Sequence, residues 1–167
     1  MEQKFSLTPH THYHLECRDK DGNLRWEDTI DNIVVTTGMN QLIDANFKTG
    51  LAAPAWFVGL VGTNHTYDAA NTLASHAAWD ENANYTGDRK AFNVSGNAIA
   101  AGALSNSNNK ATFVFTGTAN PDTINGAFLT DQETGNIGIL YGVGDLSAAR
   151  TVYDGDTLTV TVTVSVS

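Results

Sequence analysis

Histidines that alternate along one short segment are the side chains of this chain best suited to metal chemistry. They are His10, His12 and His14, which His65 and His76 could join. On an extended strand, side chains two residues apart share one face at a spacing of about 6–7 Å, from which two imidazoles can bind one zinc ion. Glu16 and Arg18 fall on the same face. The sequence therefore favours a solvated or partner-facing histidine strip over a metal site, with a pH-sensitive contact as a third interpretation.

Three other segments imitate catalytic or metal-binding motifs without completing them. Residues 19–23 resemble the start of a calcium loop, but Ile30 stands where that loop needs a bidentate Glu, so a hairpin turn is favoured. The Ser75-His76 dipeptide lacks the G-x-S-x-G context of a nucleophile elbow. The Asp80-Glu81 dipeptide does not supply two carboxyl groups that face each other, as glycoside hydrolysis requires. We therefore predict no catalytic residue, no metal and no cofactor.

Bulk composition limits the classes of function. The 167 residues fit one domain that buries about 70% of the surface of its extended chain. Nine Lys and Arg against 18 Asp and Glu give a net charge of −9, so binding to nucleic acid or to an anionic membrane is not expected. Cys17 is the only cysteine, which excludes an intramolecular disulfide. The single cysteine fits synthesis in a reducing cytoplasm, and no signal peptide or transmembrane segment is recognisable.

Alternating apolar residues predict short strands as the elements that position these side chains. Residues 10–18 place Tyr13, Leu15 and Cys17 on one face and the histidines on the other. Residues 56–61 are apolar on both faces, which indicates a central strand covered on both sides. Further strands are predicted at residues 24–26, 30–35, 90–95, 110–116, 123–130, 137–141 and 157–167, with a bulge at residues 31–32 and loops at residues 96–109 and 142–149.

One helix and one structured insertion complete the prediction. Thr37 is placed to cap a helix that Gly50 ends, and the helix has a single apolar stripe of Met39, Leu42, Ile43 and Phe47. The polar segment 63–88 contains regularly spaced aromatic residues, so it is expected to pack on the domain. The predicted fold is mainly β, a two-sheet antiparallel β-sandwich with one short helix at residues 10–167, preceded by an extended arm at residues 1–9.

Several segments resemble head-decoration or capsid-cement proteins of tailed bacteriophages. They are WFVGLVG at 56–62, NTLASHAAW at 71–79 followed by Asp80, Glu81, Tyr85 and Arg89, residues 19–44, GAFLT at 126–130 and DGDTLTVTVTV at 154–164. The resemblance covers most of the chain and rests on folding residues and turns, so it carries over no active site. It also implies a jelly-roll-like topology.

The resemblance implies a non-enzymatic virion protein that binds the outer surface of the capsid and stabilises the head. Its expected partners are the major capsid protein and further copies of itself in a homotrimer, and it would be made in the cytoplasm of the host bacterium. The residues expected at capsid or subunit interfaces are Phe5, Leu7, Pro9, Trp79, Tyr85 and Arg89. The alternative is a virion module that binds a host glycan or receptor through exposed Trp79, Tyr85 and nearby Asp or Asn side chains. Trp56 is expected in the core because of the area it would bury.

Overall fold

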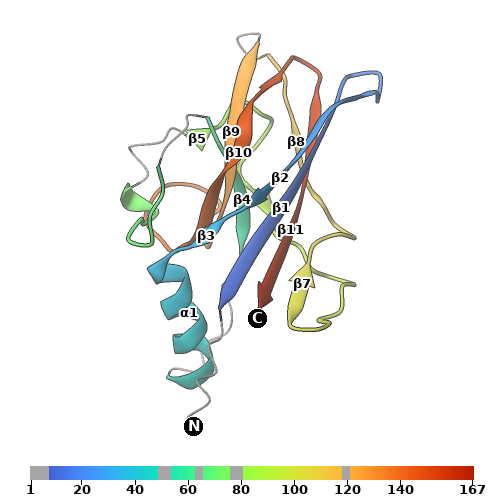
Figure 1. The fold of residues 1–167 in the computed structure, drawn as a ribbon. Coiled ribbons are helices and arrows are strands. Elements are labelled where there is room, and N and C mark those ends of the chain that lie inside the picture. Colours follow the sequence, from blue (N-terminus) through green and yellow to red (C-terminus); the bar gives the residue numbers. More distant parts are fainter. Residues whose placement is uncertain (1–7, 49–53, 63–65, 76–80, 118–120) are drawn as a thin grey trace.

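Two antiparallel sheets face each other, and one helix lies at one end of the sandwich (Figure 1). This computed structural model describes residues 8–48, 54–62, 66–75, 81–117 and 121–167. The first sheet has the order β2 (Leu24–Asp31), β1 (Pro9–Arg18), β11 (Thr157–Val166) and β7 (Ala103–Ser105), and β8 (Ala111–Val114) also pairs with β11. The second sheet has the order β3 (Ile33–Val34), β10 (Leu140–Val152), β9 (Asp122–Thr130), β4 (Phe57–Val61) and β5 (Glu81–Asn82), and β6 (Lys90–Ala91) also pairs with β4.

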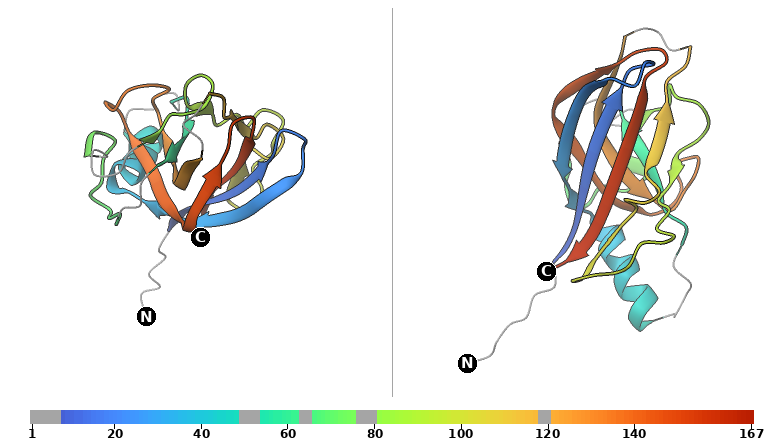
Figure 2. Two further views of the ribbon diagram at one scale, coloured as in Figure 1. Left: turned by 90° about the horizontal axis from the view of Figure 1, so that it is seen from above. Right: turned by 90° about the vertical axis from the view of Figure 1, so that its right-hand side faces the viewer.

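The predicted fold class, a mainly β two-sheet antiparallel sandwich with one short helix, is confirmed. The first strand pairs with the last, from Pro9 opposite Val166 to Arg18 opposite Thr157, and β3 pairs with β10. This nested pairing is the jelly-roll-like feature, while the hairpins β1–β2 and β9–β10 each stay within one sheet. The chain passes from the first sheet to the second at Asn32, where the sequence predicted a bulge. Figure 2 shows the two layers from above.

The core lies between the sheets and follows the alternation of the sequence. On β1 the side chains of Tyr13, Leu15 and Cys17 are fully buried, as predicted. On β11 every second residue from Leu158 to Val162 is fully buried, while the intervening threonines are half-buried on the other face. Burying one large aliphatic or aromatic side chain contributes about 1.5–3 kcal/mol, so these alternating strands supply much of the driving force for folding.

A second, smaller core covers the opposite face of the second sheet. Its buried residues are Val35, Val61, Leu73, Phe128, Leu140 and Val143. Leu73 comes from the predicted insertion, whose described residues pack on the domain: the Tyr67 hydroxyl donates to Asp145, and Ala69 accepts from the backbone N–H of Thr36. The strand β4 is therefore covered on both faces, as its continuous apolar sequence predicted.

The prediction of a loop at residues 142–149 was wrong, because β10 runs without interruption through them. Gly142 and Gly144 lie where β10 is crowded by Ile30 near the end of β2 and by Asn32, which joins β2 to β3. A Cβ atom at Gly142 would lie 2.6 Å from Asn32 Nδ2, and one at Gly144 would lie 2.5 Å from Ile30 Cγ2. These glycines permit close packing between layers. β7 likewise lies within the segment 96–109 that was predicted as loop.

The helix α1 (Thr36–Phe47) forms where it was expected, but its predicted cap is absent. Val35 occupies the N-cap position, and the Thr37 hydroxyl donates instead to the Leu140 carbonyl oxygen at 2.7 Å. Met39 and Leu42 pack against the core, whereas Ile43 and Phe47 from the same predicted stripe are 59% and 83% exposed. The helix thus extends its apolar stripe past the sheets. The predicted stop at Gly50 lies outside the described residues.

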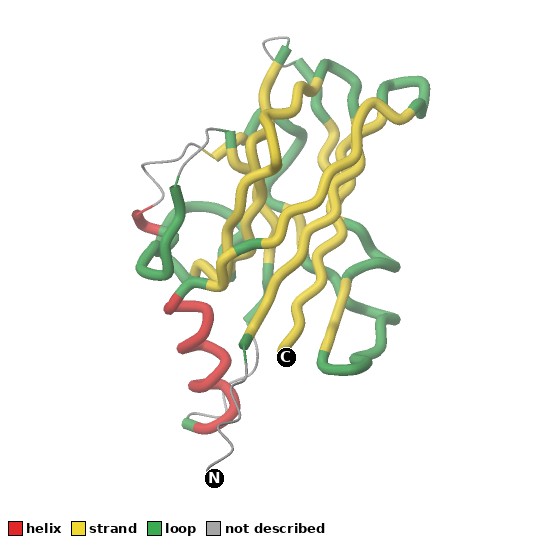
Figure 3. Tube along the Cα trace, in the orientation of Figure 1, coloured by secondary structure: helices red, strands yellow, loops and turns green. Residues whose placement is uncertain are grey.

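The first described residues, Thr8 and Pro9, belong to the first sheet although they were predicted to be part of an arm. Pro9 pairs with Val166, and the backbone of Thr8 exchanges hydrogen bonds of 2.8 and 3.1 Å with Ser167. Figure 3 shows this paired end of the first sheet beside the helix. Among the described residues, no helix is long and apolar enough to cross a membrane.

Candidate interaction surface

The histidine strip lies on the outer face of the first sheet, where each imidazole has its own neighbour. The three contacts are His10 Nε2 to Ser167 Oγ at 3.1 Å, His12 Nδ1 to Asp31 Oδ1 at 2.8 Å and His14 Nε2 to Glu27 Oε1 at 3.0 Å. No group of three or more His, Cys, Asp or Glu side chains in the described part of the chain is placed to hold a metal ion. His65 and His76 lie outside the described residues.

Residues 19–23 form the hairpin turn between β1 and β2. One carboxylate oxygen of Asp19 accepts the backbone N–H groups of Asp21 and Asn23, each at 2.9 Å. These bonds, above all those from Asn23, hold the pKa of Asp19 below its usual value. Gly22 has a φ of 86°, which suits glycine. The Asp19 carboxylate is therefore used to close the turn, as the hairpin interpretation predicted.

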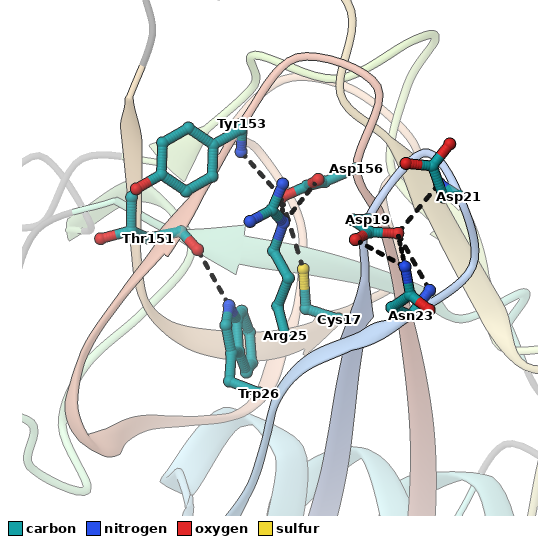
Figure 4. A network of polar contacts seen from close by, with 9 residues as sticks. All are labelled: Cys17, Asp19, Asp21, Asn23, Arg25, Trp26, Thr151, Tyr153 and Asp156. Atoms are coloured by element: carbon teal, nitrogen blue, oxygen red, sulfur yellow. Dashed lines mark hydrogen bonds and ion pairs between the residues drawn. The ribbon is translucent and has the colours of Figure 1, made fainter.

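A polar cluster that the sequence did not reveal lies beside this hairpin (Figure 4). The fully buried Asp156 carboxylate accepts hydrogen bonds from Arg25 Nε and from the Tyr153 backbone N–H, both at 2.9 Å. The Arg25 guanidinium also lies over the Tyr153 ring, 4.7 Å from its centroid. Nearby, Trp26 Nε1 donates to the Thr151 carbonyl oxygen at 2.9 Å. The cluster joins the β1–β2 hairpin to the turn between β10 and β11.

Cys17 belongs to this cluster but is not an activated nucleophile. Its thiol is fully buried and lies 3.9 Å from the Asp156 carboxylate. Burial raises the pKa of the Cys17 thiol to about 12, and the negative charge of Asp156 adds to the rise. A reactive cysteine requires the opposite shift and access to solvent. The cluster therefore has a structural role.

Tyr85 and Arg89, which were expected at an interface, are buried within the chain itself. Tyr85 is 7% exposed and packs edge-on against Phe113, with ring centroids 4.7 Å apart. Arg89 is 6% exposed and forms a bidentate ion pair with Glu81, in which Nε donates to Oε1 at 2.8 Å and Nη2 to Oε2 at 2.6 Å. Its guanidinium also donates to the carbonyl oxygens of Gln132 and Gly135. A part in an interface stays a prediction for both residues, while Phe5, Leu7 and Trp79 lie outside the described residues.

Two apolar grooves lie at the end of the sandwich where α1, the start of β1 and the end of β11 meet. The larger, here called the inter-sheet groove, has a volume of about 530 Å³ and opens between the two sheets. Its walls include Trp56, Phe92, Leu104, Tyr141 and Val164. The smaller, here called the helix groove, has a volume of about 330 Å³ and is lined by Pro9, Met39, Leu42, Ile43, Asn46, Phe47 and Val166. Leu42 and Val166 line both grooves, so the two are continuous.

The rim of these grooves exposes large apolar side chains. Ile43, Phe47, Ile99 and Val166 are 59%, 83%, 74% and 42% exposed, and each lines one or both grooves. None of the described residues that line either groove is charged, although the chain has a net charge of −9. A contiguous apolar surface of this kind is typical of a site that binds another protein or an apolar ligand. Among the predicted interface residues that the structure describes, Pro9, Tyr85 and Arg89, it is Pro9 that lies here.

Comparison with known proteins agrees with a structural role. The family model described as "Podophage GP4 fiber I protein gp80" matches residues 34–165, about four fifths of the chain. The match includes α1, both sheets except β1 and β2, and most of the groove residues. No curated protein matched the chain. The match confirms the predicted relationship with phage structural proteins, and it does not distinguish head decoration from a fibre. The chain belongs to the family of podophage GP4 fiber I protein gp80, and it is a structural protein of the phage virion.

Proposed function

We propose that this chain is a non-enzymatic virion subunit that attaches to another phage protein through the helix groove and the adjoining face of α1. The observation that supports this most is the exposure of Ile43 and Phe47, at 59% and 83%, on a helix whose other apolar residues pack on the core. A virion structural protein must be held by contacts with other virion proteins. An uncharged apolar rim is suited to a partner that presents an apolar surface of its own.

The expected gain from this contact can be estimated from the two exposed side chains. Burial of a large apolar side chain contributes about 1.5–3 kcal/mol, and both are already partly covered. Together they would contribute roughly 3 kcal/mol, which corresponds to a change on the order of 100-fold in the dissociation constant. A single charged substitution at Phe47 should therefore suffice to weaken attachment measurably.

The placement that we propose first is the outer surface of the capsid, with the chain acting as a cement protein bound to the major capsid protein. A protein that binds the assembled shell and not the separate subunits stabilises the shell by mass action. Further copies of this chain in a homotrimer would add contacts around each capsid site. Trp79 and the segment that precedes Thr8 are proposed contacts in this arrangement.

The second placement is a fibre-type module that binds a host glycan or receptor. The family description, which names a fibre protein, supports this placement as well as it supports any other virion location. The polar turns at the β1–β2 and β10–β11 connections lie at the opposite end from α1 (Figure 1) and would face outward. In both placements the α1 end faces the particle.

Particles assembled without this chain provide the test. Purified wild-type protein, Phe47→Asp and Ile137→Asp would be added, and the bound fraction measured after sedimentation. Ile137 is a matched control because it is 86% exposed but lines neither groove. We expect Ile137→Asp to bind like wild type and Phe47→Asp to lose binding by at least about tenfold. Equal binding of wild type and Phe47→Asp would contradict the proposed attachment.

The same assay separates the two placements. Binding to isolated tailless heads supports the cement placement, whereas binding only to complete particles, together with signals on a glycan array, supports the fibre-type module. Electron microscopy with gold-labelled antibodies would give the position directly.

A further inference from the structure

Tyr141 carries an unpaired polar atom in the wall of the inter-sheet groove. The residue is 3% exposed, and its hydroxyl has no hydrogen-bond partner. The Tyr141 ring packs edge-on against Trp56, which also lines this groove, with centroids 5.3 Å apart and an interplanar angle of 72°. A buried hydroxyl without a partner is destabilising, and buried polar groups in native proteins are normally paired.

Two buried hydroxyls close to Tyr141 along the chain or in space are satisfied, whereas the hydroxyls of Tyr141 and of Thr11 on β1 have no partner. The Tyr13 hydroxyl donates to the Gly142 carbonyl oxygen, and the Thr37 hydroxyl donates to the Leu140 carbonyl oxygen. Tyr141 lies between these two acceptors on β10, yet its own hydroxyl remains unpaired. The groove thus has an apolar lining and, in the residue Tyr141 of its wall, one buried hydroxyl without a partner. A peptide in extended conformation fits both, because it brings apolar side chains together with backbone groups that can form hydrogen bonds.

The chain itself contains a segment of this kind next to the groove. Residues 1–7, which precede Thr8, read MEQKFSL and contain Phe5 and Leu7 two positions apart, on one face if the segment is extended. Thr8 pairs with Ser167, and its neighbour Val166 lines both grooves. Seven extended residues reach about 23 Å, which is long enough to cross to an adjacent molecule.

The direction of β1 indicates whether residues 1–7 bind the inter-sheet groove of their own chain or that of a neighbouring copy. Thr8 is paired with the last residue of the sequence at the end of the first sheet, so a straight continuation of β1 leads past that end. Entry into its own inter-sheet groove would require a reversal beneath β11. A neighbouring copy whose groove lies within reach of the segment can receive it without that reversal.

We propose that the inter-sheet groove binds residues 1–7 of a second copy of this chain, with Phe5 against Trp56 and a backbone group of the segment paired with the Tyr141 hydroxyl. The exchange joins copies of the chain to one another and leaves Ile43 and Phe47 available for attachment to the virion. It therefore does not depend on the proposed attachment, and each can fail without the other.

The mass of the purified full-length protein in light scattering tests the exchange. The wild type should form particles that are a multiple of the 17.8 kDa chain, and Phe5→Asp should return them to a single chain. Ser6→Asp adds the same charge on the opposite face of an extended segment and should leave the mass unchanged. Tyr141→Phe removes the unpaired hydroxyl, so it should keep or raise the thermal midpoint while it weakens association.

A peptide of residues 1–8 added to Phe5→Asp protein then identifies the groove as the receptor. Quenching or a spectral shift of tryptophan fluorescence that disappears in Phe5→Asp/Trp56→Phe protein supports the proposal. A wild-type protein that is a single chain at all concentrations would overturn it, even if the peptide binds, because the segment would then occupy its own groove. An assembly that survives Phe5→Asp would overturn it as well.

Discussion

Replacing Arg89 with Ala removes the side chain that ties β5 to the loop between β9 and β10. The guanidinium is 4% exposed, forms both bonds to the Glu81 carboxylate, and donates to the carbonyl oxygens of Gln132 and Gly135 at 3.0 and 2.8 Å. It also lies 5.1 Å from the centroid of the Phe128 ring. Its loss leaves a largely buried carboxylate and two carbonyl groups without this donor.

The expected cost is that of breaking a buried ion pair by removing one partner, about 3–5 kcal/mol of unfolding free energy. With a urea dependence of roughly 2 kcal/mol per molar, the unfolding midpoint should fall by about 1.5–2.5 M. Circular dichroism of the isolated protein measures this midpoint. Arg89→Lys should lose less unfolding free energy than Arg89→Ala. It keeps the positive charge but not the guanidinium donors that bind Glu81 and the loop together.

Asp88→Ala is the matched control, because Asp88 is an exposed neighbour of Arg89 and its loss should change stability by no more than about 0.5 kcal/mol. An unfolding free energy of Arg89→Ala within about 1 kcal/mol of wild type would refute this role of Arg89. Such a result, combined with loss of binding to particles, would instead support the prediction that Arg89 lies at a capsid or subunit interface.

Three further predictions concern the core, the buried ionisable groups and the histidine strip. Gly59→Ala should lower the thermal midpoint by about 4–8 °C, since the new methyl group would overlap the Phe128 ring; an unchanged midpoint would show that the ring can move. The free energy of unfolding should keep its full value below about pH 9 and fall as the pH rises toward 12. The pKa values of Cys17 and Tyr141 are each raised to about 12 in the folded chain, so these two groups ionise first in the unfolded chain and favour it at high pH. Urea midpoints between about pH 8 and 11 check this decline, and Cys17→Ala should delay its onset. Excess zinc should leave the thermal midpoint unchanged, and a rise that His12→Ala abolishes would instead reveal a metal site.

Local alternation was sufficient to predict the strands whose packing depends on their own sequence. In β1 from Tyr13 to Cys17 and in β11 from Leu158 to Val162 every second residue is apolar, and the structure buries those residues between the sheets. The long strand β10 was missed because Gly142 and Gly144 signal a turn when read locally. Their actual role, to let Asn32 and Ile30 approach, depends on a contact between residues more than 100 positions apart. The Thr37 cap failed for the same reason, since its hydroxyl pairs across the fold with Leu140.

The candidate surface could be predicted less well than the fold. The groove residues come from α1, β1, β7, β9, β10 and β11 and from the segments around Trp56 and Phe92, and most are ordinary apolar residues whose exposure depends on where the sheets end. The helical spacing of Ile43 and Phe47 correctly placed them on one stripe with Met39, but only the structure shows that the stripe extends beyond the core. The Arg25–Asp156 pair joins residues 131 positions apart, and no local pattern marks it.

The orientation of this chain on the virion tests the central claim most directly. Electron cryo-microscopy of the assembled particle, at a resolution that separates α1 from the β1–β2 hairpin, would measure it. We expect the α1 end, with Ile43 and Phe47, to be buried against another virion protein while the hairpin at residues 19–23 faces solvent. A particle in which the hairpin end makes the contact and Phe47 remains exposed would contradict it.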